Sequence, residues 1–94
     1  MQRVPRLTEG FIRRRRALGL TSGASATALA RTVGALARGP LPGAADFETL
    51  VPPVRRYWVR RVSGFNLWVF YTFSDDNVTL RTLSNSPPVP LDDD

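Results

Sequence analysis

The fold is decided by residues 54–83, which read VRRYWVRRVSGFNLWVFYTFSDDNVTLRTL. β-Branched and aromatic residues dominate three runs in this stretch, as is typical of strands, and turn-forming residues separate the runs. The middle run is almost continuously apolar, which is typical of a central strand covered on both faces. The stretch therefore predicts an antiparallel meander of three strands, over about residues 54–62, 66–74 and 78–83.

The residues before this stretch have helical periodicity. Thr8 is a typical N-cap, and it predicts a helix over about residues 9–18. Ser25 predicts the start of a second helix over about 26–38, in which apolar residues recur at i, i+4 and i+7. The two helices predict an α-helical hairpin packed on one face of the small antiparallel sheet, because no other part of the chain can cover it. The fold class is therefore α+β.

The remaining segments are predicted to be less regular. Residues 4–7 predict at most a short fourth strand at the edge of the sheet, because Pro5 cannot donate to a strand ladder. Residues 41–53 predict a connector that is anchored to the core by its apolar side chains. Three prolines follow residue 86, so we expect a flexible acidic tail over residues 87–94. A chain of 94 residues accommodates one domain, 1–94.

The composition excludes several kinds of chemistry. The chain has no cysteine and no histidine, which removes disulfides and the commonest metal ligands. We therefore expect no metal site and no small-molecule cofactor. No apolar run has the length of a membrane span, so no membrane association is expected. The simplest compartment for such a chain is a reduced cytoplasm of the bacterial type.

The charge is distributed unevenly along the chain. All 13 basic residues are arginines. Twelve of them against three acids give residues 1–61 a charge of +9, whereas one arginine against five acids gives residues 62–94 a charge of −4. A basic body predicts an anionic partner: a nucleic acid, an acidic protein segment or the acidic tail of the chain itself. Solubility combined with arginine-rich coding is the simpler alternative.

The order and spacing of these elements resemble a known family. The resemblance rests on the two helices, a connector with proline and glycine, the strand 57–62 (YWVRRV), the turn and central strand 64–71 (GFNLWVFY), the Asp75-Asp76 turn and the strand 78–83. Over about residues 25–86 the chain resembles the RelE/ParE superfamily of toxins from bacterial type II toxin–antitoxin systems. The resemblance implies a small growth-inhibiting toxin that is neutralised by a cognate antitoxin, which is acidic and partly disordered.

The family resemblance implies two modes of action. Ribosome-dependent members are mRNA interferases that bind and cut mRNA with basic residues on the sheet, whereas ParE-like members poison DNA gyrase. For cleavage, the resemblance places catalytic cations at Arg60, Arg61 and Arg81. The closing segment 84–88 (SNSPP) contains no arginine, lysine, tyrosine or histidine for proton transfer. The residues therefore leave open a ribonuclease, a non-catalytic gyrase inhibitor and a non-toxic nucleic-acid-binding module.

Further basic and aromatic residues are candidates for contact with nucleic acid or antitoxin. Strand alternation places Arg56, Trp58 and Arg60 on one face and Arg55, Tyr57 and Arg61 on the other. Such a strand is also typical of a solvated edge that charge protects from aggregation. Arg81 is expected to pair with Asp75 or Asp76. The complete set of candidate contact residues is Arg55, Arg56, Tyr57, Trp58, Arg13, Arg14, Arg15 and Arg16.

Overall fold

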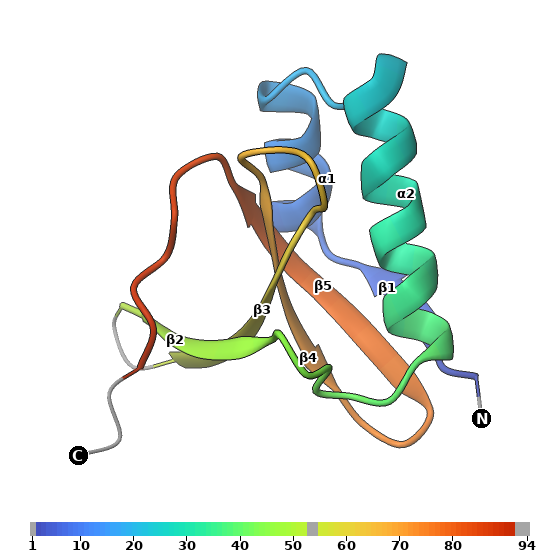
Figure 1. Cartoon of the computed structure of the whole chain (residues 1–94), viewed down its shortest axis with the longest axis vertical. Helices are drawn as coiled ribbons and strands as arrows, with labels where there is room; N and C mark the ends of the chain where they lie inside the picture. Colours follow the sequence, from blue (N-terminus) through green and yellow to red (C-terminus); the bar gives the residue numbers. More distant parts are fainter. Residues whose placement is uncertain (1, 53–54, 92–94) are drawn as a thin grey trace.

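The chain forms one mixed five-stranded sheet with two helices on one of its faces (Figure 1), which confirms the α+β class. The computed structural model describes residues 2–52 and 55–91. The strand order across the sheet is β1-β5-β4-β3-β2. In chain order the elements are β1 (Val4–Leu7), α1 (Glu9–Ala17), α2 (Gly23–Arg38), β2 (Phe47–Val51), β3 (Arg55–Arg61), β4 (Trp68–Phe73) and β5 (Asn77–Ser84).

The predicted meander is present as β3, β4 and β5. Its pairing is antiparallel throughout, with Val59 opposite Phe70 and Phe73 opposite Val78. The first four residues of β4 are buried, as expected of a strand covered on both faces. Val54, expected as the first residue of the meander, lies outside the described residues.

Two more strands enlarge this sheet. β1 pairs with β5 in parallel, with Val4 opposite Asn77 and Leu7 opposite Leu80, so the sheet is mixed rather than purely antiparallel. β2 pairs antiparallel with β3 and lies inside the segment that the sequence predicted as a connector, so that prediction was wrong. The reason is that Phe47, Thr49 and Val51 alternate with more polar or exposed positions. One side of this five-residue strand therefore packs against the apolar side chains of the neighbouring strands.

The first helix agrees with the sequence prediction. The hydroxyl of Thr8 accepts a hydrogen bond from the Phe11 N–H at 3.2 Å and donates one to the Leu80 carbonyl at 2.8 Å. Thr8 therefore caps α1 and fixes it to β5. Phe11, which is 1% exposed, is the buried anchor of this helix.

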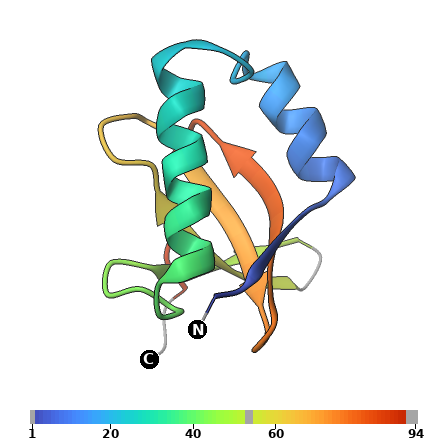
Figure 2. The ribbon, with the colours of Figure 1, turned by 90° about the vertical axis from the view of Figure 1, so that its right-hand side faces the viewer.

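The second helix begins three residues earlier than predicted. Its N-cap is Ser22 rather than Ser25, and Gly23 starts the helix with a φ of +86°, a conformation that glycine adopts without strain. Figure 2 shows that the two helices share a short loop but diverge from it, so each packs separately on the sheet rather than as a tight hairpin. Their buried side chains join Val69, Tyr71 and Leu80 in the main core.

The other sheet face has its own small apolar cluster. Val59, Trp68 and Phe70 form it, and the chain after β5 runs beside it. Residues 87–91, predicted as a flexible tail, instead follow the outer edge of β2. Thr49 bridges to Pro90, and the Leu91 N–H donates to the Glu48 carbonyl at 2.7 Å. This pairing does not need the N–H that proline lacks. Residues 92–94 of the predicted tail lie outside the described part.

Candidate functional site

β3 distributes its candidate residues over the two faces of the sheet, as the alternation predicted. Trp58 and Val62 belong to the core beneath the helices, and we call that side the helix face. Tyr57 and Val59 belong to the cluster on the opposite side, which we call the far face. Arg60 and Arg61 are consecutive, so they leave the strand on opposite faces.

Arg60 is held on the helix face by a buried carboxylate. Its Nε donates to Asp46 Oδ1 at 2.7 Å and its Nη2 donates to Oδ2 at 2.9 Å, which is a bidentate ion pair. The side chain of Asp46 is 1% exposed and that of Arg60 is 21% exposed. Asp46 also accepts hydrogen bonds from the Gly43 N–H at 2.9 Å and from the Tyr71 hydroxyl. We call these four residues the Asp46 cluster.

The Asp46 cluster shifts the protonation equilibria of its members. Burial alone would raise the pKa of Asp46, but the hydrogen bonds from Arg60, Tyr71 and Gly43 outweigh it and lower that pKa below its ordinary value. The bond to Asp46 raises the pKa of Arg60. Burial, followed by the bond to Asp46, raises the pKa of Tyr71. Tyr71 is therefore a neutral donor at physiological pH, and Arg60 and Asp46 are both charged.

Gly43 is required for this arrangement. A Cβ atom on Gly43 would overlap the guanidinium of Arg60, which the carboxylate prevents from moving away. The absence of a side chain at residue 43 therefore lets the loop before β2 close over Arg60. No sequence pattern pointed directly to this cluster, although Asp46 is the single acid between Glu9 and Glu48.

Arg61 and Arg81 contact neutral groups on the far-face side. Arg61 is exposed, its Nε donates to the Phe65 carbonyl at 3.1 Å, and its guanidinium lies 5.8 Å from the centre of the Trp68 ring. The predicted pairing of Arg81 with Asp75 or Asp76 is wrong, because Arg81 Nε donates to Thr72 Oγ1 at 3.0 Å. Among the described residues the ion pairs are Arg60–Asp46 and Arg13–Glu9, so neither Arg61 nor Arg81 has a carboxylate partner there.

A β-bulge directs Arg81. Phe70 is opposite Thr82, but the next residue, Tyr71, is opposite Leu80, so Arg81 is the extra residue that has no counterpart on β4. Bulges redirect side chains in this way. The Arg81 side chain consequently reaches Thr72, two residues along β4 from Phe70 and on the same face as it.

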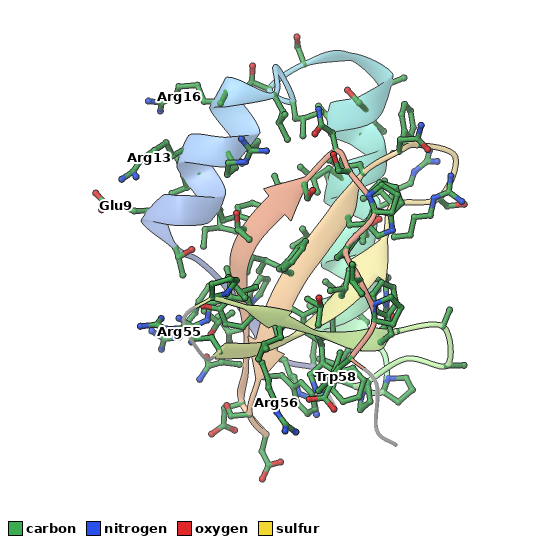
Figure 3. All side chains as sticks on the ribbon, turned by 90° about the vertical axis from the view of Figure 1, so that its left-hand side faces the viewer. Glu9, Arg13, Arg16, Arg55, Arg56 and Trp58 are labelled. Carbon is green, nitrogen blue, oxygen red and sulfur yellow. The ribbon has the colours of Figure 1, made fainter. Side chains whose placement is uncertain are left out.

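The remaining β3 candidates lie at the beginning of the strand. Arg55 and Arg56 are exposed and project from the edge of the molecule (Figure 3). Tyr57 is partly buried at the margin of the far-face cluster, while Trp58 is partly buried against the main core. Tyr57 is therefore the phenol on the far face, because Tyr71 is fully buried and bound to Asp46.

The four arginines of α1 point in different directions around the helix. Arg13 and Arg16 project into solvent (Figure 3), and the Arg13–Glu9 pair is long, at 4.0 Å, and exposed. Arg14 Nε donates to the Leu83 carbonyl at 3.1 Å. Arg15 Nε is buried and has no hydrogen-bond partner among the described residues.

Arg15 lines a groove of about 440 Å³ between α1 and α2. The rest of the groove wall is mostly apolar and includes Leu7, Phe11, Leu20, Leu29 and Val33. Leu7 is 44% exposed even though it is a large apolar residue. The groove thus combines an apolar surface with one cationic group that lacks a partner, which suits an apolar segment carrying a carboxylate.

Residues 2–52 and 55–91 contain no group of three acidic, histidine or cysteine side chains that could hold a metal ion. Within the same residues, no helix is both long and apolar enough to cross a membrane. No protein-family model, no curated protein and no solved structure matches this chain.

Proposed function

We propose that this chain is the toxin of a bacterial type II toxin–antitoxin pair, of the RelE/ParE kind, and that it acts in the cytoplasm by ribosome-dependent mRNA cleavage. The observation that carries the proposal is the set of cationic and phenolic side chains on the far face. Tyr57 packs against the apolar cluster of this face, Arg61 lies over its Trp68 ring, and Arg81 bonds Thr72 on the same face. The two arginines have no carboxylate partner among the described residues. Two cations and one partly exposed phenol on one face of the sheet suit a single-stranded RNA substrate.

Each far-face residue has a chemical role in this proposal. Attack of a ribose 2′-hydroxyl forms the bond from O2′ to phosphorus, breaks the bond from phosphorus to the 5′ oxygen and passes the 2′-hydroxyl proton to a solvent water. Negative charge builds on the non-bridging oxygens, which the guanidinium of Arg81 stabilises, while Arg61, beside Trp68 at the other end of the face, binds a neighbouring phosphate. The 5′ oxygen leaves and must gain a proton, which the hydroxyl of Tyr57 donates. Tyr57, which is partly buried at the margin of the cluster, has the ring on which a base can stack. Arg60 has no direct role here, because Asp46 neutralises it on the other face.

The arrangement of elements gives separate support. A first strand, two helices and then a run of antiparallel strands is the order that the family resemblance implies, and the first strand is present despite Pro5. The antitoxin would occupy the groove between α1 and α2. An acidic, partly disordered antitoxin segment supplies both an apolar side for the groove and a carboxylate for the guanidinium of Arg15, which lines it.

The decisive test is the variant Tyr57→Phe, which keeps the ring and removes the hydroxyl. We expect induced expression of the wild-type chain to arrest growth and to cut translated messages, as detected by primer extension. Tyr57→Phe should reduce cleavage at least about 100-fold, the usual contribution of a general acid, while the fold is retained. The matched control Arg16→Gln changes an exposed residue on α1 and should cut like the wild type. Wild-type cleavage by Tyr57→Phe would overturn the assignment.

Inhibition of DNA gyrase is the second candidate. The ion pair of Arg60 with Asp46 favours it. Of the three arginines that the family resemblance placed in RNA cleavage, this pair leaves two free to bind RNA. In that case the wild-type chain would arrest growth and recover a topoisomerase in a pull-down, with no cut message. Absence of growth arrest by the wild-type chain would contradict both modes and favour a non-toxic nucleic-acid-binding module.

A further inference from the structure

A second cationic hollow lies beside α2, where β3 ends and both Arg60 of the helix face and Arg61 of the far face reach it. It has a volume of about 400 Å³ and lies between α2 and the end of β3. Arg31, Arg60, Arg61 and Ser63 contribute its polar lining. In Figure 2, α1 lies on one flank of α2, whereas the β3–β4 loop and the loop before β2 lie on its other flank. α2 therefore stands between the hollow and α1.

α2 faces two different environments on its two flanks. The four α2 residues that line the cationic hollow are spaced at i, i+3, i+4 and i+7 from Ala28, which places them on one side of the helix. Ala26, Leu29, Ala30 and Val33 line the apolar groove on the other flank. The groove offers large apolar side chains, whereas the α2 side of the hollow offers Ala28, Thr32, Ala35 and the cation Arg31.

The hollow has an excess of positive charge. It is lined by three arginines, and no acidic residue lines it. Asp46 balances one of them from the adjacent hollow of about 350 Å³, which Arg60 and Arg61 also line. Three guanidinium groups and one carboxylate leave a local charge of +2. Arg31 is exposed and makes no hydrogen bond to a described residue.

Asp46 also fixes the direction of one donor. Its carboxylate engages Nε and Nη2 of Arg60, and no described residue accepts a hydrogen bond from Nη1. In a planar guanidinium, Nη1 points away from the edge that carries Nε and Nη2. Arg60 is therefore a fixed cation with an unused donor, while Arg31 and Arg61 are exposed cations beside it.

We propose that this hollow binds the phosphodiester backbone of a nucleic acid. Phosphate oxygens match the guanidinium donors, and the small side chains of α2 let a backbone approach closely. The adjacent hollow shares Arg60 and Arg61 with this one, so successive phosphates can pass from one hollow to the other across the end of β3. An acidic protein segment fits less well, because the α2 side of the hollow has no large apolar residue to anchor it. The proposal does not depend on toxicity or on RNA cleavage.

The test measures binding of fluorescently labelled 12-nucleotide RNA and DNA of the same sequence to the purified chain by anisotropy, over a range of salt concentrations. We expect Arg31→Gln to weaken binding roughly 5-fold and to reduce the log–log salt slope by about one, because one phosphate contact is lost. Arg16→Gln removes the same charge from exposed α1 and serves as the matched control, with a smaller effect. Both variants keep the described hydrogen bonds, so folding is not at issue.

Several outcomes separate this proposal from others. Equal losses in Arg31→Gln and Arg16→Gln, or no binding by the wild-type chain, would overturn it. Competition by poly-glutamate as effective as that by unlabelled oligonucleotide would also overturn it. Tighter binding of RNA than of DNA would assign the site to RNA, and equal binding would assign it to the backbone alone; both outcomes support a phosphodiester site.

Discussion

The two faces of the sheet treat neighbouring arginines differently. On the helix face, the carboxylate of Asp46 fixes Arg60. The side chain of Asp46 is 1% exposed. On the far face Arg61 and Arg81 contact a carbonyl, an aromatic ring and a hydroxyl, all of which are neutral. The comparison teaches that the placement of acids, rather than the count of arginines, decides which cations are available to a partner.

The largest effect is expected from Asp46→Asn. The substitution keeps the shape of the side chain but leaves the largely buried Arg60 without its counter-charge, so the free energy of unfolding should fall by about 3 kcal/mol. Urea denaturation measures this change. Glu9→Gln breaks the long, exposed ion pair on α1 and should leave the urea midpoint unchanged. Equal urea midpoints for Asp46→Asn and the wild type would show that the ion pair with Asp46 does not stabilise the fold. The contrast between the two faces would then be wrong.

A smaller effect is expected from acid. The pKa of Asp46 is lowered in the folded chain from an ordinary value of 3.8, so the unfolded chain binds more protons as the pH falls. The stability from this carboxylate is complete well above pH 3.8 and is lost as the pH falls through the folded pKa. Urea midpoints at pH 6 and pH 3 should therefore differ more for the wild type than for Asp46→Asn. The same loss in both proteins would contradict the assignment to Asp46.

The smallest effect on stability is expected from Arg61→Gln. This arginine contributes one contact with the Trp68 ring and one hydrogen bond at the surface, so the free energy of unfolding should fall by only about 0.5 to 1 kcal/mol. Thermal unfolding followed by circular dichroism measures it. A loss as large as that of Asp46→Asn would mean that Arg61 is structural, and the contrast between the faces would disappear.

Local patterns predicted the parts of the molecule that local forces determine. The first helix, the meander and the face of each β3 residue follow from capping, turns and alternation, and the structure confirms them. β2 was missed because the five-residue alternation of Phe47–Val51 lies between Gly43 and the pair Pro52-Pro53, and these residues are typical of a connector. The partner of Arg60 was missed because it lies 14 residues away and depends on how a loop closes.

The candidate site could be predicted only in part for the same reason. The sequence identified Arg61, Arg81 and Tyr57, but the bulge that directs Arg81 depends on the register between two strands. Arg31 was missed because an isolated arginine on a helix has no distinguishing pattern, and only the packing of α2 beside β3 gives it two cationic neighbours.

The parallel pairing of β1 with β5 determines when this sheet can be completed. Val4 pairs with Asn77, so more than seventy residues must be synthesised after Val4 before β1 can pair with β5. Contacts between such distant parts of a chain raise the entropic barrier and slow folding. During translation, the segment from β1 to β4 therefore emerges with one neighbour of the central strand missing, and the five-stranded sheet forms only after β5 has emerged.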